Sequence, residues 1–165
     1  MSRPALALLG FMGAGKSTIG RLVAEAEGVP FRDLDEVIEM SVGMTIAGFF
    51  ERRGEAAFRE VEARLLPDLV DPDVVLALGG GSVLDDGSWS LLRARALTVW
   101  LDGPLELLWR RAGGATRPLL RDRSTAEVEL MLESRRARYA EAAHRVDAGR
   151  PAAAVVAEVR RLWAG

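Results

Sequence analysis

The 165-residue chain contains no cysteine and only one histidine, His144. Without cysteine, disulfide bonds, thiolate chemistry and cysteine-ligated zinc are excluded, and a single histidine excludes a metal site built from several imidazoles. No apolar run approaches the ~18 residues of a membrane-spanning helix, and the N-terminal MSRPALALLG does not resemble a secretory signal peptide. We therefore expect a cytoplasmic protein that does not associate with membranes.

A large excess of charge is also missing. The formal net charge is −2, so nothing in the composition favours binding to nucleic acid or to an anionic membrane. Lysine is nearly absent, because Lys16 is the only lysine among the 22 Lys+Arg residues. An ammonium on a flexible stem can reach into a tight backbone ring around phosphates, where the wide guanidinium of arginine fits poorly. The single lysine therefore draws attention to its surroundings.

What the chain does contain is an alternation of short apolar segments and segments with helical periodicity. Because the first and third apolar segments are apolar almost throughout, they are typical of strands buried on both faces of a parallel sheet. The alternation predicts one domain, residues 1–165, folded as a three-layer α/β sandwich around a five-stranded parallel sheet. The predicted strands are 5–10, 29–35, 74–79, 97–102 and 144–147, and helical stripes follow at 19–26, 58–69, 105–109, 125–142 and 155–162.

A phosphate-binding motif follows the first predicted strand. The string GFMGAGKST, residues 10–18, matches the P-loop pattern and opens a predicted helix, as that motif requires. Its glycines allow backbone N–H groups to point at phosphate oxygens, Lys16 can reach the β- and γ-phosphates, and the Ser17 hydroxyl can ligate Mg²⁺. The motif predicts nucleotide binding but does not distinguish kinases from other P-loop proteins.

Two aspartates follow the second predicted strand. Two-residue alternation would place Asp33 and Asp35 on one face, at the edge where open parallel sheets bind ligands. One carboxylate could support Mg²⁺ and the other could orient an attacking hydroxyl. Asp35 also fits a helix N-cap. The third predicted strand ends in GGG, residues 79–81, and not in an acidic residue, so Asp33 would have to supply the carboxylate for the metal. The glycines would also allow a ligand to approach the backbone closely. A flexible turn is the alternative for the glycines.

With these motifs in place, the sequence resembles the shikimate kinases, nearly end to end. The motifs that carry the resemblance are, in order, GFMGAGKST, FRDLD, FFERRGEAAFREVE, LALGGGSV, ATRPLL and RRARYAEAA. The resemblance implies a fold like that of the nucleoside-monophosphate kinases, with a mobile lid at about 112–124 and a substrate-binding helical segment at about 34–69. It also implies a monomer that transfers the γ-phosphate of ATP, with Mg²⁺, to the 3-hydroxyl of shikimate.

The resemblance further implies roles for individual residues. Asp35 would bind the shikimate hydroxyls and act as the base, Arg59 and Arg135 would hold its carboxylate, and Arg117 would swing in with the lid to neutralise charge. The implied catalytic residues are Lys16, Asp35 and Arg117; the nucleotide-binding residues are Gly13, Ala14, Gly15, Lys16, Ser17, Thr18, Arg111, Arg117, Arg150 and Pro151; the substrate-binding residues are Asp35, Arg59, Gly79, Gly80, Gly81 and Arg135; and the metal-binding residues are Ser17 and Asp33.

Several alternatives remain at this stage. Arg136 replaces Arg135 as the carboxylate ligand if the register is shifted by one, and both Arg59 and Arg135 could be solvated surface charges. A gluconate kinase or a nucleoside-monophosphate kinase is the nearest competing enzyme. A nucleotide-binding module without turnover is the competing class, although Lys16, Asp35, Arg59 and Arg117 are all present.

Overall fold

The computed structural model describes residues 2–113 and 123–165, so Arg117 and most of the predicted lid lie outside the described residues. Five parallel strands form one sheet in the order β2-β3-β1-β4-β5, which confirms the predicted α/β fold. The strands are β1 (Ala5–Leu9), β2 (Phe31–Asp33), β3 (Val75–Ala77), β4 (Ala96–Asp102) and β5 (His144–Asp147).

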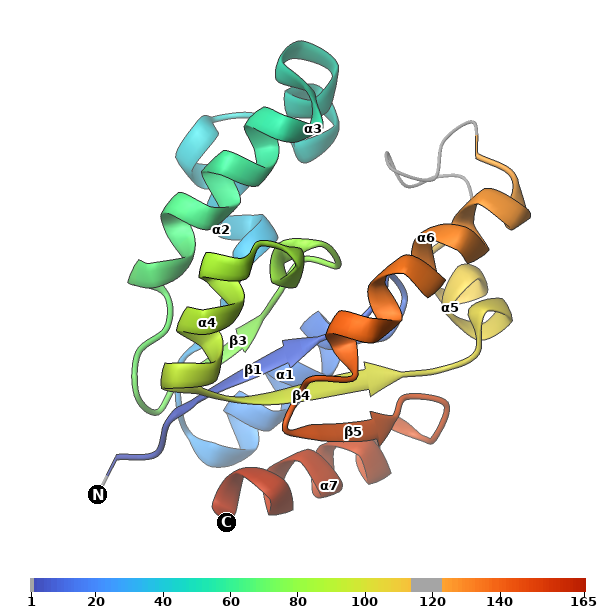
Figure 1. The fold of residues 1–165 in the computed structure, drawn as a ribbon. Helices are drawn as coiled ribbons and strands as arrows, with labels where there is room; N and C mark the ends of the chain where they lie inside the picture. The colour runs from blue at the N-terminus through green and yellow to red at the C-terminus, as the bar shows by residue number, and fades with distance from the viewer. Residues whose placement is uncertain (1, 114–122) are drawn as a thin grey trace.

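Helices cover both faces of this sheet (Figure 1). Helices α1 and α7 lie on one face, and α4 and α6 lie on the other. None of the helices in the described part of the chain is both long and apolar enough to cross a membrane. The helices are α1 (Lys16–Glu27), α2 (Leu34–Val42), α3 (Ile46–Leu65), α4 (Asp86–Arg95), α5 (Leu105–Arg111), α6 (Thr125–Tyr139) and α7 (Ala152–Ala164), with short 3-10 turns η1 (Leu66–Asp68) and η2 (Ser82–Leu84).

The path of the chain after β2 differs from the sequence prediction. The strand ends at Asp33, whose carboxylate accepts hydrogen bonds from the N–H groups of Asp35 at 3.0 Å and Glu36 at 3.4 Å. Asp33 is thus the N-cap of α2, and Asp35 is a helical residue rather than a strand residue or a cap. Aspartate is among the strongest N-cap residues, so helix capping here ends the two-residue alternation that the apolar pattern suggested.

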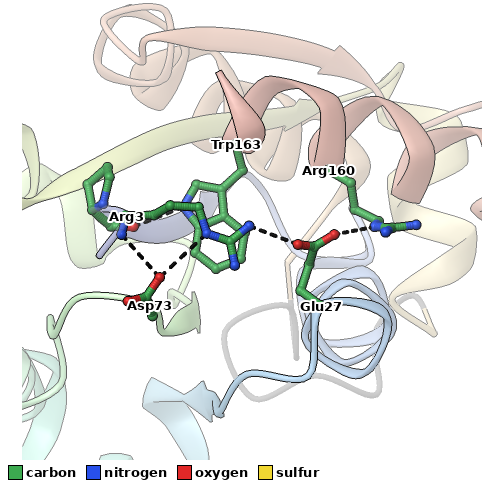
Figure 2. A network of polar contacts seen from close by, with 6 residues as sticks. Arg3, Glu27, Asp73, Arg160 and Trp163 are labelled. Atoms are coloured by element: carbon green, nitrogen blue, oxygen red, sulfur yellow. Dashed lines mark hydrogen bonds and ion pairs between the residues drawn. The ribbon is translucent and has the colours of Figure 1, made fainter. Parts of the chain in front are cut away.

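A cluster of charged side chains joins the two ends of the chain (Figure 2). Arg3 pairs with Glu27 at 2.8 Å and with Asp73 at 3.5 Å, and its guanidinium carbon lies 3.8 Å from the ring centroid of Trp163. Arg160 of α7 also contacts Glu27, at 2.6 Å. The hydrogen bonds from Arg3 and then from Arg160 lower the pKa of Glu27. This Arg3 cluster lies at the edge of the sheet where the strands begin.

Candidate active site

The phosphate-binding loop lies between the end of β1 and the start of α1. Gly10 and Gly13 have φ angles of +146° and +80°, and a Cβ atom on Gly13 would lie only 2.1 Å from the carbonyl oxygen of Leu108. The Lys16 ammonium donates hydrogen bonds to the carbonyl oxygens of Gly10 at 2.7 Å and Phe11 at 3.1 Å. Lysine therefore reaches back over the loop from the first turn of α1, where a phosphate would meet the ammonium and the helix N-terminus together.

A cavity of about 420 Å³ opens above this loop, and we call it the nucleotide cavity. The structure brings eight of the predicted nucleotide-binding residues to its lining: Gly13, Ala14, Gly15, Lys16, Ser17, Thr18, Arg111 and Arg150. Pro151 is the N-cap of α7 and lies between two lining residues, Arg150 and Ala152.

Arg111 and Arg150 form the far side of the nucleotide cavity. The Arg111 guanidinium donates a 2.6 Å hydrogen bond to the carbonyl oxygen of Ala148, which ties α5 to the loop after β5. Arg150 pairs with Glu158 of α7, and its Nε is buried without a hydrogen-bond partner among the described residues. Both planar groups are thus held in place beside the cavity, where they can stack on an aromatic base.

The two residues predicted to serve a metal are in direct contact. The Ser17 hydroxyl donates a hydrogen bond to one carboxylate oxygen of Asp33, and the other oxygen caps α2. Magnesium commonly takes one or two oxygen ligands from protein and the rest from phosphates and water, and a hydroxyl beside a carboxylate at the phosphate loop fits that pattern. In the described ranges, no three acidic, histidine or cysteine side chains converge as a metal site.

A second cavity of about 450 Å³ lies beside the first, between α2, α3 and the glycine turn after β3. We call it the acceptor cavity, because a phosphate acceptor would have to bind next to the nucleotide. Its lining combines two arginines and two aromatic rings with five carboxylates: Arg59, Arg135, Phe50, Phe58, Asp33, Asp35, Glu36, Glu39 and Glu62. The two cavities share a wall formed by Met12, Ser17, Asp33, Asp35, Gly79 and Gly80.

Arg59 is held by acidic partners on its own helix. Its guanidinium donates to Glu62 at 2.7 Å and to Glu55 at 3.4 Å, and Glu62 accepts a 2.6 Å hydrogen bond from the Ser82 hydroxyl. Burial lowers the pKa of Arg59, but the attraction and hydrogen bonds of Glu62 and Glu55 together outweigh that effect, so the pKa lies above its ordinary value. Ser82 was not among the predicted residues, because its contact with Glu62 joins segments 20 residues apart.

The glycine turn leaves room for these charged side chains. A Cβ atom on Gly79 would lie 2.8 Å from a carboxylate oxygen of Glu62, and one on Gly81 would lie 2.4 Å from the Arg59 guanidinium. On Gly80 the nearest atom would be Nη1 of Arg135, at 3.1 Å. The sequence suggested that the glycines expose backbone to a ligand. The structure adds that they allow charged side chains to pack directly on the turn.

Neighbouring arginines on α6 face different surroundings. Arg135 is 4% exposed, lines the acceptor cavity, and its Nη1 has no hydrogen-bond partner among the described residues. Arg136 instead pairs with Asp102 at 3.1 Å and with Glu133 at 2.7 Å. Of the two registers that the sequence left open, the structure therefore favours Arg135 as the residue that faces a ligand.

The arrangement has a clear chemical meaning. The nucleotide cavity, which contains Lys16, adjoins the acceptor cavity. In the acceptor cavity, guanidinium groups can bind a carboxylate, and Asp35 can accept a hydrogen bond from a hydroxyl. Because the cavities share a wall, a hydroxyl bound in one lies close to a terminal phosphate bound in the other. Phosphoryl transfer to a hydroxy acid is the reaction that this geometry suits best.

Comparison with known proteins bears on this interpretation. The family model described as shikimate kinase matches residues 12–162. A shikimate kinase of Salinibacter ruber is 40% identical over 92% of this chain and 80% of its own length, and one of Gloeobacter violaceus is 44% identical over 96% and 92%. The structure resembles that of the shikimate kinase from Acinetobacter baumannii in complex with shikimate, with a TM-score of 0.88, 33% identity, and coverage of 97% of this chain and 92% of that one. The chain therefore belongs to the shikimate kinase family.

Proposed function

We propose that the protein transfers the γ-phosphate of ATP to the 3-hydroxyl of shikimate, giving shikimate 3-phosphate and ADP on the route to chorismate and the aromatic amino acids. The observation that carries this proposal is the shared wall between the nucleotide cavity and the acceptor cavity, with Asp35 in it. Family membership supports the choice of acceptor, since the relatives carry the shikimate kinase name over most of this chain.

Two arginines would hold the carboxylate of shikimate. Arg135 has a buried Nη1 without a partner among the described residues, and the Arg59 guanidinium packs on the same glycine turn, so both groups line the acceptor cavity. A guanidinium fork matches a carboxylate in two parallel hydrogen bonds, which fixes the orientation of the ligand as well as its position. Phe50 and Phe58 would pack against the ring of the substrate.

Asp35 would accept the hydrogen bond of the attacking hydroxyl and take its proton as the new P–O bond forms. Lys16 would bind the β- and γ-phosphates and stabilise the charge that develops as the bond to ADP breaks. Ser17 and Asp33 would hold Mg²⁺, which supplies neutralisation of the phosphate charge. Arg117 would add positive charge near the β–γ bridge; this assignment rests on the family resemblance, since Arg117 lies outside the described residues.

Gluconate and nucleoside monophosphates are the competing acceptors. Gluconate also carries a carboxylate, but the acceptor cavity combines its two arginines with two phenylalanine rings, which suit a cyclic ligand better than an open polyol chain. A nucleoside monophosphate would need a cavity that stacks a second base. The acceptor cavity favours shikimate over both.

The proposal is tested by measuring ADP release with each acceptor in turn. We expect shikimate to be the preferred acceptor and Asp35→Asn to lower kcat by about 10²–10⁴-fold, because the amide cannot take the proton. Asp71→Asn, a change at an exposed carboxylate that pairs with Arg32, is the matched control and should leave kcat unchanged. Preference for gluconate would overturn the assigned acceptor, and normal turnover by Asp35→Asn would overturn the role of Asp35.

A further inference from the structure

A buried carboxylate lies outside both cavities, at the end of β4. Asp102 is 5% exposed and lies in a surface hollow with Arg136, Arg145 and Asp147. It contacts Arg136 of α6 at 3.1 Å and Arg145 of β5 at 2.5 Å. A buried carboxylate needs such partners because removal from water is costly. The phosphoryl transfer proposed above assigns no task to this cluster.

The two arginines that contact Asp102 belong to different elements of the fold. Arg145 belongs to an edge strand, and its side chain is 68% exposed. Arg136 is 29% exposed and follows directly after Arg135 on α6. Successive residues of a helix point in directions about 100° apart. A contact that holds Arg136 against β4 therefore also sets the rotation of α6 and, with it, the direction in which Arg135 points.

The side chain of Arg135 is buried among its neighbours, but no hydrogen bond of its Nη1 within the described residues fixes the direction in which it points. Its guanidinium carbon lies 5.6 Å from the ring centroid of Phe11, and its Nη1 has no hydrogen-bond partner in the described part of the chain. One turn further on, the Tyr139 hydroxyl donates to the carbonyl oxygen of Gly80. Asp102–Arg136 and Tyr139–Gly80 thus attach the last turns of α6 to the sheet and to the glycine turn.

We propose that Asp102 is a positioning residue for the carboxylate of the acceptor: through Arg136 it holds α6 in the rotation that directs Arg135 into the acceptor cavity. This inference rests on the proposed function, in which Arg135 binds that carboxylate. Asp102 lines neither the nucleotide cavity nor the acceptor cavity. Its contribution is the orientation of a side chain that binds the acceptor, so its loss should weaken acceptor binding and leave ATP binding unchanged.

The chain offers a matched pair of variants for the test. Arg136→Gln and Arg145→Gln each remove one positive charge from the same carboxylate, but only Arg136 is itself a residue of α6. We expect Arg136→Gln to raise the KM for shikimate by about 5–10-fold, within the range expected when an energetic coupling is lost. The KM for ATP should stay the same, and Arg145→Gln should leave both values within about twofold, since exposed ion pairs contribute little.

The variant Asp102→Asn distinguishes a positioning role of Asp102 from a direct effect of its negative charge on the binding of the acceptor. Removal of a negative charge near the cavity would favour an anionic acceptor, so a field effect lowers the KM for shikimate. Positioning predicts the opposite, a KM raised by about the same factor as in Arg136→Gln. Asp102→Glu, which keeps the charge, should recover part of the loss. The melting temperature of each variant is measured as well, so that a variant that fails to fold is recognised. If an Asp102 variant does not fold, the test rests on Arg136→Gln.

A second background tests whether the effect passes through Arg135. In an Arg135→Ala protein, adding Arg136→Gln should raise the KM for shikimate no further, because residues that act in series are not additive. If Arg136→Gln raises the KM for shikimate by its full factor in the Arg135→Ala background, the proposal is overturned. It is also overturned if the wild type phosphorylates shikimate and Arg136→Gln and Arg145→Gln have equal KM values. If the wild type phosphorylates a different acceptor, the proposed function itself fails, and the positioning role fails with it.

Discussion

Arginines at opposite edges of the same sheet have opposite kinds of surroundings. In the Arg3 cluster, where the strands begin, Arg3 has two carboxylate partners and the face of Trp163, and Glu27 has two arginines. At the other edge, buried nitrogens of Arg135 and Arg150 have no hydrogen-bond partner in the described part of the chain. The contacts of the Arg3 cluster are made within the protein, whereas Arg135 and Arg150 each line a cavity in which a ligand can complete their contacts.

This difference shows how the same residue type serves two purposes. A buried polar group without a partner costs stability, so native proteins keep few of them. Where such groups face a cavity, the binding of a complementary anion supplies the missing hydrogen bonds. We therefore expect the Arg3 cluster to contribute to stability with little effect on turnover, and Arg135 to contribute more to turnover than to stability.

The largest expected effect comes from replacing Arg135 with alanine and comparing the result with the same change at Arg3. Arg135→Ala should lower kcat/KM for shikimate by about 100-fold, or ~3 kcal/mol, through loss of a buried charge–charge contact with the substrate. Its melting temperature should fall less than that of Arg3→Ala, because the loss of packing is offset in part by removal of a buried nitrogen that has no partner in the described residues. Steady-state kinetics and thermal unfolding of the same preparation measure both quantities.

Arg3→Ala is the counterpart of that variant. It should lower the melting temperature and keep kcat/KM, since Arg3 lies at the far edge of the sheet from both cavities. The contrast between Arg135 and the Arg3 cluster breaks down if Arg135→Ala destabilises the protein as much as Arg3→Ala does, or if both variants lose the same fraction of activity.

A smaller effect is expected from Gly81→Ala. The new methyl group would lie 2.4 Å from the Arg59 guanidinium, which is the far end of a flexible side chain and can move away. Because displacement of a binding group by about 1 Å is costly to turnover, we expect the KM for shikimate to rise roughly 10-fold with little change in stability. Gly87→Ala, on α4, is the control glycine. An unchanged KM in Gly81→Ala would show that Arg59 does not need its observed position.

The smallest effect concerns Glu27 and its response to pH. Glu27→Gln should lower the free energy of unfolding at neutral pH by about 1 kcal/mol, or roughly 2–4 °C in melting temperature for a chain of this size. Because the folded state lowers the pKa of Glu27 from its ordinary value of 4.5, its contribution is full above that value and is lost as the pH falls through the folded pKa.

Unfolding curves measured from neutral to acidic pH check this prediction. The stabilities of the wild type and of Glu27→Gln should converge in acid, with kcat/KM equal at neutral pH. A stability difference that persists unchanged into acid would mean that the charge of Glu27 is not what stabilises the Arg3 cluster.

Local patterns were enough to predict the sheet and the phosphate loop. Strands β1, β3 and β4 are short, mainly apolar segments, and the loop is identified by residues that are close in sequence, from Gly10 to Ser17. Helix α4 was not predicted, because DGSWSLLRAR has no clear apolar stripe and the helix begins with an N-cap, Asp85, which accepts a 2.7 Å hydrogen bond from the N–H of Ser88. The N-cap therefore determines where α4 begins more than a pattern of apolar residues does.

The charge networks could not be predicted for a different reason. The contact between Asp102 and Arg136 joins residues 34 positions apart, and its existence depends on how α6 is rotated against β4. The choice between Arg135 and Arg136 depends on the same rotation, which spacing from Tyr139 could suggest but not establish. Packing of the folded chain, rather than local sequence, determines which arginine faces the acceptor cavity.

The wall between the two cavities has a consequence for inhibitor chemistry. Met12 and Asp35 are reached from both sides, and the flat backbone of Gly79 and Gly80 forms the rest of the partition with Ser17 and Asp33. A single molecule that joins a phosphate mimic to a cyclic carboxylate would need only a very short linker to occupy both spaces. Short linkers give the highest effective concentration of the second group once the first has bound, so bisubstrate compounds are a natural design for this protein.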